Sequence, residues 1–171
     1  MSDFQSVKVR YLDASALIKL VVDETDAHLI RVFFHENTNF CTTSLCLAEA
    51  LGRLKGLWKK GRKDGVELST DQYFKATREL IIDAWGGRIE VDELKLLDPM
   101  IHTDVESLAK KYNVDLSDAL QLITIKKGRY SVFVSDSASI LITADGPLAG
   151  AAKSEGIRVW NCTEEPVPPW A

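Results

Sequence analysis

Residues 7–15 read VKVRYLDAS, a short run of β type that ends in an acid. Apolar side chains at alternate positions up to Leu12 predict a strand, and a mostly apolar run follows from Ala16 to Val22. Asp13 would therefore stand at the carboxyl end of a strand, against apolar surroundings. In an open α/β sheet, ligands bind at that edge. Asp13 is also explained more simply as the amino-terminal cap of a following helix.

The rest of the chain is predicted to alternate between strands and helices. Ser69 and Gln72 have the spacing of a capping box, and Asp98 before Pro99 is a strong helix start. Further strands are predicted at residues 39–42, 88–94, 140–143 and 157–160. Helices are predicted from Thr25 or Asp26 to 34, from a Ser44 cap to about 61, from 69 to 85, from 98 to 112, from a Ser117 cap to about 128, and from Pro147 to 156. Strands separated by helices favour right-handed crossovers, so we expect an α/β fold with a parallel sheet.

Length and composition indicate one domain over residues 1–171. The chain is 46% hydrophobic and can bury roughly two thirds of its unfolded surface in a single core. We expect that core at about 7–161 and a C-terminal tail at 162–171 that is at the surface or mobile. Three cysteines without a close pair indicate no disulfide framework. Without a signal peptide or a membrane-spanning run, a cytoplasmic protein with no membrane partner is expected.

Charge excludes the attraction of nucleic acid by the molecule as a whole. There are 21 Lys and Arg against 25 Asp and Glu, which gives a net charge of −4. Two local basic clusters stand out, at residues 58–63 (WKKGRK) and at Lys126, Lys127 and Arg129. Both clusters also suit the carboxyl ends of helices, where cations are favourable, so they are more simply explained as solvated helix ends.

Three further acids occupy positions comparable to that of Asp13. Glu49 falls on the helix face opposite the predicted core, where a weak i,i+4 pair with Arg53 is the simpler explanation. Asp118 falls in the first turn of a predicted helix, where it would complement the helix dipole. Asp145 follows a predicted strand and precedes Pro147, so it is also a candidate helix cap.

Taken together, the four acids indicate a metal site. Two are predicted at the ends of parallel strands, and two lie early in helices that can face the same edge. Carboxylates a few ångströms apart repel one another unless they are protonated or bound to metal. Because all donors are oxygens, with no paired His or Cys, Mg²⁺ or Mn²⁺ is favoured over zinc.

The chain resembles the PIN-domain ribonucleases, and within them the toxins of VapBC-type toxin–antitoxin pairs. The resemblance lies in four short motifs that occur in the family's order across nearly the whole chain. They are YLDASALIKL at 11–20, SLCLAEAL at 44–51, LSDALQL at 116–122 and LITADGPLA at 141–149.

The resemblance implies a PIN-like three-layer α/β/α sandwich around a central parallel sheet. It implies an acidic quartet that acts as catalytic and metal-binding residues, with Ser15 supporting the first acid. The quartet is Asp13, Glu49, Asp118 and Asp145. It also implies an RNA substrate, a cognate antitoxin protein and frequent dimers.

The chain departs from the family's pattern at two places. Residue 14 is Ala where a hydroxyl residue is common in the family. The link from Gly128 to Ser139 is long, and its Asp136 rivals Asp145 as the fourth acid, although Asp145 has the strand-end position.

The activity expected is metal-dependent hydrolysis of RNA phosphodiester bonds, in which divalent cations activate the attacking water and leave a 5′-phosphate. A metal-free route through His28, His35 and His102 is disfavoured because none adjoins the acids. A haloacid-dehalogenase-type phosphoryl transferase needs an Asp where Ser15 stands. The alternative that stays open is a catalytically inactive PIN-like domain that binds RNA or protein as a scaffold.

Overall fold

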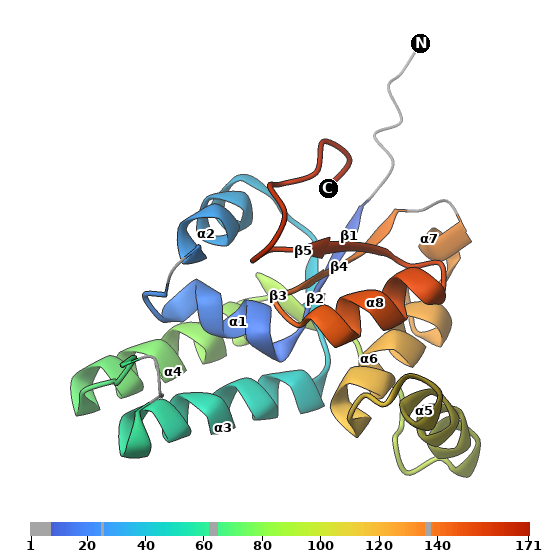
Figure 1. Cartoon of the computed structure of the whole chain (residues 1–171), viewed down its shortest axis with the longest axis horizontal. Helices are drawn as coiled ribbons and strands as arrows, with labels where there is room; N and C mark the ends of the chain where they lie inside the picture. The colour runs from blue at the N-terminus through green and yellow to red at the C-terminus, as the bar shows by residue number, and fades with distance from the viewer. Residues whose placement is uncertain (1–7, 25, 62–64, 136–137) are drawn as a thin grey trace.

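The computed structural model describes residues 8–24, 26–61, 65–135 and 138–171. Five strands form one sheet in the order β3-β2-β1-β4-β5, and all neighbouring strands are parallel (Figure 1). The strands are β1 (Val9–Leu12), β2 (Phe40–Thr42), β3 (Ile89–Val91), β4 (Ser139–Thr143) and β5 (Arg158–Asn161). Because β2 and β4 lie on opposite sides of β1, the strand order reverses at β1.

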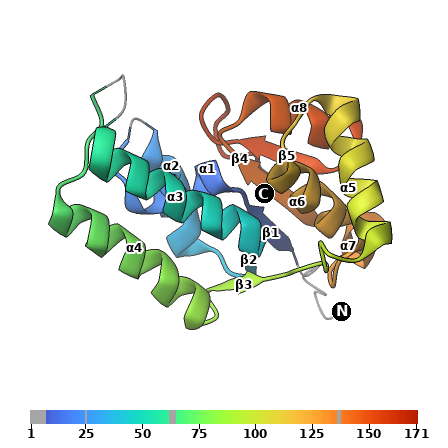
Figure 2. The same ribbon diagram turned by 90° about the horizontal axis from the view of Figure 1, so that it is seen from below.

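Helices cover both faces of the sheet, which makes a three-layer α/β/α sandwich. Figure 2 shows α1 to α4 on one side, and α5, α6 and α8 on the other. The helices are α1 (Ala14–Val21), α2 (Ala27–Glu36), α3 (Ser44–Lys60), α4 (Thr70–Trp85), α5 (Pro99–Tyr112), α6 (Leu116–Lys127), α7 (Val132–Ser135) and α8 (Gly146–Ser154). Within the described ranges, no helix is both long and apolar enough to cross a membrane.

The central strands contribute to two cores, one on each face of the sheet. Leu12 and Ile140 pack with α1 to α4, whereas Val9, Tyr11 and Leu141 pack with α5, α6 and α8. All five side chains are buried. Burial on both faces explains why β4 is apolar without interruption from residue 140 to residue 142. The expected α/β class with a parallel sheet is therefore confirmed.

Two helix caps differ from the sequence prediction. Thr43, not Ser44, caps α3 by accepting a hydrogen bond from the backbone of Cys46. Asp115, not Ser117, caps α6 by accepting from the backbone N–H of Asp118. Both true caps have extended backbone, which a cap residue requires. Residues one or two positions apart can both be good capping types, and the backbone conformation selects between them.

Three other segments differ in detail. The strand predicted at 88–94 is limited to β3 because its partner β2 offers only three residues. Asp26 occupies the cap position of α2, but it has a left-handed backbone and no side-chain capping bond. The long link after Gly128 contains the short helix α7. Thr25 and Asp136, each an alternative in the sequence analysis, lie outside the described residues.

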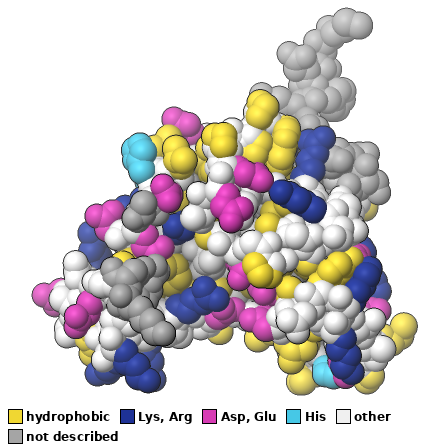
Figure 3. Space-filling model, viewed as in Figure 1, with side chains coloured by type: hydrophobic (Ala, Val, Ile, Leu, Met, Phe, Trp, Pro, Cys, Tyr) yellow, Lys and Arg dark blue, Asp and Glu magenta, His cyan; other side chains and the backbone are white. Residues whose placement is uncertain are grey.

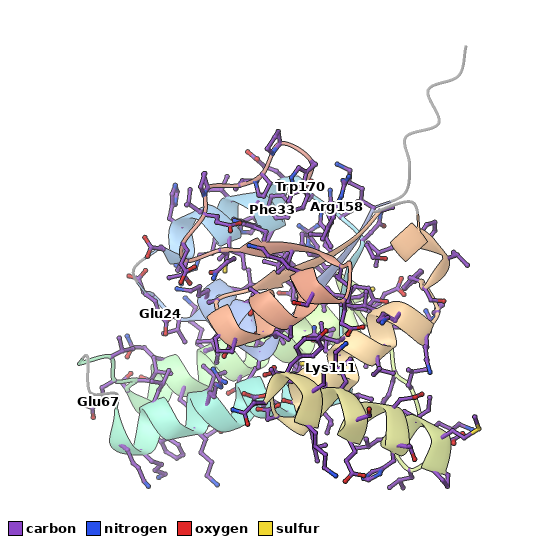
Figure 4. All side chains as sticks on the ribbon, turned by 45° about the vertical axis from the view of Figure 1, so that its right-hand side comes forward. Glu24, Phe33, Glu67, Lys111, Arg158 and Trp170 are labelled. Atoms are coloured by element: carbon purple, nitrogen blue, oxygen red, sulfur yellow. The ribbon has the colours of Figure 1, made fainter. Side chains whose placement is uncertain are left out.

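The C-terminal tail lies at the surface, which is one of the two outcomes predicted for it. The end of the tail packs on the core. Trp170 is partly buried against the core, and the Arg158 guanidinium lies 5.4 Å from the centre of its ring. Lys8 Nζ donates to the backbone oxygen of Trp170 at 2.7 Å. Figure 4 shows Arg158, Trp170 and Phe33 in the same region of the molecule. The end of the tail therefore lies beside the starts of β1 and β5.

One buried hydrogen bond yields a stability prediction. Tyr11 donates its hydroxyl to Oδ2 of the buried Asp92 at 2.7 Å. We expect Tyr11→Phe to lower the free energy of unfolding by about 1.5–3 kcal/mol, because a buried carboxylate loses a donor. Tyr130→Phe is the matched control, since its hydroxyl donates to Glu90 in an exposed bond, and it should lose on the order of 0.5 kcal/mol. Urea unfolding at pH 7 measures both, and equal losses would contradict the prediction.

Candidate functional site

The candidate site lies where the carboxyl ends of β1 and β4 meet. Leu12 pairs with Ile142, and the next backbone N–H, that of Asp13, donates to the oxygen of Ile142 at 3.2 Å. Strand β1 leads into α1 on one face of the sheet, and β4 leads into α8 on the other (Figure 1). This is the switch point of a doubly wound sheet, where α/β proteins bind ligands.

Asp13 is a buried carboxylate held by three neighbouring residues. Its side chain caps α1 by accepting from the backbone of Ala16 at 2.8 Å. The hydroxyls of Ser15 and Thr143 donate to its oxygens at 2.8–2.9 Å. Burial raises the pKa of Asp13 to about 6, although these hydrogen bonds act in the opposite direction. The capping role, predicted as the simpler explanation of Asp13, is confirmed. The raised pKa also means that burial disfavours the charged form of this carboxyl group.

Glu49 connects α3 to α6. Its Oε1 lies 2.5 Å from a guanidinium nitrogen of Arg53, which confirms the expected i,i+4 pair. Its Oε2 accepts from the hydroxyl of Ser117, at 2.6 Å, on the other helix. Ala50 and Leu54 are fully buried on the opposite side of α3, as the helical periodicity predicts. A surface ion pair alone does not explain this arrangement, because Glu49 also bonds across the site.

Asp118 is the acid whose surroundings are most negative. It lies in the first turn of α6, as predicted. Burial raises its pKa to about 7, with further contributions from the charges of Asp115, Asp13, Asp145 and Glu49, in that order. The other three candidate acids are therefore all within electrostatic reach of one side chain.

Asp145 and Thr143 connect the end of β4 to the segment that follows β1. Asp145 caps α8 by accepting from the backbone of Leu148 at 2.9 Å, so its predicted capping role is confirmed. Its own N–H donates to the hydroxyl of Thr143, the same hydroxyl that donates to Asp13. Ser15 accepts in turn from the backbone of Ala144 at 2.7 Å. The hydroxyls of Ser15, at the start of α1, and Thr143, at the end of β4, thus fix the two strand-end acids relative to one another.

The four predicted acids converge, but they do not form a finished metal cage. Figure 3 shows acidic side chains gathered near the centre of one face, with a basic side chain beside them. Among the described residues, no three His, Cys, Asp or Glu side chains are placed closely enough to hold a metal ion as they stand. Two of the carboxylates are instead bonded to other side chains. Asp13 accepts from the hydroxyls of Ser15 and Thr143, and Glu49 is bonded to Arg53 and Ser117.

Two functional neighbours were missed by the sequence analysis. Asp115 contributes a fifth negative charge, and its position three residues before Asp118 is a capping signal that was given to Ser117 instead. Gln121 is fully buried below the acids, where its amide nitrogen donates to the last backbone oxygen of β1, that of Leu12, at 2.9 Å. Its side-chain oxygen accepts from the thiol of Cys46. A lone glutamine in an apolar helix gives no sequence signal for this role.

The remaining polar candidates lie elsewhere. All three histidines are exposed, on α2 and α5. Every cation of the second basic cluster is paired with an acid. The pairs are Lys126 with Glu155, Lys127 with Asp104 and Arg129 with Glu90. Of the first cluster, residues 58–61 are described, and Arg62 and Lys63 lie outside the described residues. The second cluster therefore offers little free positive charge.

The fold and the site define a class: an α/β protein with an acidic site at the carboxyl ends of its central parallel strands. No family model and no curated protein matches the chain. Among solved structures, the chain is similar to PAE2754 from Pyrobaculum aerophilum, with a TM-score of 0.55 and 20% sequence identity. The similarity covers 89% of this chain and 90% of that one. At this identity, the likeness supports the fold alone.

The raised pKa values predict how the stability of the metal-free protein changes with pH. Because the native pKa values of Asp13 and Asp118 lie above the ordinary range, the native state binds protons more tightly than the unfolded state. Stability should therefore fall as pH rises from about 4 to about 7. Asp118→Asn should reduce this fall, although it removes a dipole interaction worth about 0.3–1 kcal/mol.

Urea unfolding in EDTA at several pH values measures the effect. Asp71→Asn is the matched control, because Asp71 is an exposed acid in the first turn of α4. That variant should keep the wild-type pH dependence. An Asp118→Asn variant with an unchanged pH dependence would show that burial and the neighbouring acids do not raise the pKa of Asp118.

Proposed function

We propose that the protein is a divalent-metal-dependent ribonuclease that hydrolyses RNA phosphodiester bonds, and that it is the toxin of a toxin–antitoxin pair. The observation that carries the first part is the surroundings of Asp118, where burial is combined with the charges of Asp13, Glu49 and Asp145. Structural ion pairs bring opposite charges together, whereas this site gathers like charges at the ligand-binding edge of the sheet. The resemblance to the PIN-domain ribonucleases supports the choice of RNA and the toxin role.

The donor set fits Mg²⁺ or Mn²⁺. All four acids supply carboxylate oxygens, and the hydroxyls nearby belong to Ser15, Thr143 and Ser117. Hard divalent cations prefer such ligands, whereas Cys46 is buried with its pKa raised to about 12 and so keeps its proton. A bound cation would offset the negative charge of the acids and of the scissile phosphate and lower the pKa of water.

Each acid has a role that follows from how it is held. Asp13 and Asp118 carry the raised pKa values, so they gain most from a nearby positive charge, and we assign them as the direct metal ligands. Glu49 and Asp145 would bind the cation or orient the attacking water. In hydrolysis the oxygen of water bonds to phosphorus while the bond from phosphorus to O3′ breaks. The products carry a 5′-phosphate and a 3′-hydroxyl.

The first functional prediction concerns cleavage. Purified protein should cleave single-stranded RNA in Mg²⁺ or Mn²⁺, and EDTA should abolish the activity. Asp13→Asn should lower the rate at least 100-fold, because it removes a charge that the cation needs. Asp98→Asn is the matched control, since Asp98 is an exposed cap on α5, and it should retain the wild-type rate. Gel analysis of a labelled oligonucleotide measures both rates and identifies the product ends.

Two outcomes would contradict this prediction. Undiminished cleavage in EDTA would exclude the metal-dependent reaction. A wild-type protein that binds RNA but has the same negligible cleavage as Glu49→Gln would favour the alternative of a catalytically inactive scaffold.

The toxin role predicts an effect on growth. Expression of the wild-type chain should slow bacterial growth, and expression of Asp13→Asn should not, because growth arrest would require cleavage at the acidic site. Co-expression of a cognate antitoxin, encoded beside this gene, should restore growth. Growth curves under a titratable promoter measure the difference, with protein levels matched by immunoblot. Equal toxicity of the two proteins would separate the growth effect from this site.

A further inference from the structure

A pocket of about 560 Å³ opens beside the acidic site. Its walls come from α1, from the C-terminal half of α3, and from the segments after β4 and β5. Ser15 and Ala144 form the end nearest the acids, and Ser15 is the residue whose hydroxyl donates to Asp13. The pocket thus reaches Ser15, the residue that supports Asp13, so a ligand in the pocket would lie beside the acidic site.

The pocket combines an apolar interior with positive charge. Ile18, Leu57 and Ala144 supply apolar surface. Three cations line it against a single acid, Glu24. The cations are Lys19, Arg53 and Lys60.

The three cations differ in how far they are neutralised. Lys19 is buried in the wall of the pocket, and its Nζ lies 3.5 Å from a carboxylate oxygen of Glu24. Glu24, which is labelled in Figure 4, lies between α1 and α2. Arg53 forms an ion pair with Glu49, and its side chain is half exposed. Lys60 is exposed in the last turn of α3 and makes no ion pair within the described residues. The free positive charge of the pocket is therefore at the Lys60 end, away from the acids.

We infer that this pocket is the subsite for one unstacked nucleotide of a single strand, next to the phosphate that the acids attack. The apolar interior takes the base, and Lys60 with Arg53 takes the adjoining backbone phosphate. A volume of this size accommodates a nucleotide, and a base must leave a duplex stack to enter it. The inference rests on the proposed function for its choice of a nucleic-acid ligand. It adds that one base of the substrate is unstacked and held in this pocket, and that specificity arises on the α1–α3 side of the acids.

Gly56 provides a way to fill the pocket without disturbing the fold. It lines the pocket in the C-terminal half of α3, and a Cβ built on it meets nothing within 4 Å. Gly56→Leu therefore places a side chain in the space that the base would occupy. Gly150→Leu is the matched control, because Gly150 is a helical glycine in α8 with equally free surroundings and is not part of the pocket.

Charge reversal provides a second, independent variant. Lys60→Glu reverses the free charge of the pocket at an exposed helix end, where folding should not be affected. Lys55→Glu is its matched control, since Lys55 is an exposed lysine on the same helix that does not line the pocket. Thermal melts of all four variants check that each is folded.

The experiment measures binding of fluorescein-labelled single-stranded octamers, one of RNA and one of DNA with the same sequence, by anisotropy in Mg²⁺. All variants are made in an Asp145→Asn background, so that cleavage does not consume the probe. Gly56→Leu and Lys60→Glu should raise the Kd for RNA at least tenfold, and the two controls should stay within twofold. The same sensitivity in the DNA arm would show that base and phosphate suffice, and its absence would show that the ribose 2′-hydroxyl is also recognised.

Three results would overturn the inference: no binding of either octamer, a Kd that is insensitive to Gly56→Leu, or equal losses in the pocket variants and their controls. Its failure is distinguishable from that of the proposed function. Cleavage of RNA by the wild type, combined with insensitivity to Gly56→Leu, would reject the pocket alone. Binding that is sensitive to Gly56→Leu, combined with no cleavage by the wild type, would reject the nuclease and retain the pocket.

Discussion

The carboxylate of Asp13, buried between the ends of two parallel strands, is the constraint on which the rest of the site depends. It is only 3% exposed, and its oxygens are held by two hydroxyls and a backbone N–H. Those hydroxyls also fix the loop after β4, which carries Asp145. Since the negative charge of Asp13 contributes to the raised pKa of Asp118, burying one acid affects the protonation of another on a different helix. The strand order matters because it brings the helices α1 and α8, on opposite faces, to the same edge.

The sequence was sufficient to predict the sheet class and the meeting of the four acids at one edge. Alternating and continuous apolar runs located β1 and β4, and an acid at the end of each run located the edge. The simpler explanations of the acids were also right, because Asp13 and Asp145 cap helices and Glu49 pairs with Arg53. Local roles and a shared site are therefore compatible. An N-cap residue lies at the amino end of its helix. In a parallel α/β fold, the amino ends of the helices that follow the strands face the edge where ligands bind.

Other features could not be predicted because they depend on contacts between distant segments. Which of two nearby capping residues is used depends on backbone angles, as at Thr43 and Asp115. The bond from Ser117 to Glu49 needs α3 and α6 side by side, and the pocket is formed only where α1, α3 and the segments after β4 and β5 meet. Gln121 looks like an exception in an apolar helix until its hydrogen bond to the backbone oxygen of Leu12 is seen, an oxygen that also accepts from the hydroxyl of Thr42. Each of these follows from tertiary packing, for which a single sequence carries no local pattern.

We propose that these acids gather in order to hold a divalent cation. The most direct test is a crystal structure of the wild-type protein grown with Mn²⁺, with anomalous scattering used to locate the ion. The account predicts a manganese peak in contact with the carboxylates of Asp13 and Asp118, and rotation of Glu49 or Asp145 away from its present partner toward the ion. Crystals with full occupancy of Mn²⁺ elsewhere and none at Asp13, with the hydrogen bonds of that carboxylate unchanged, would contradict the account.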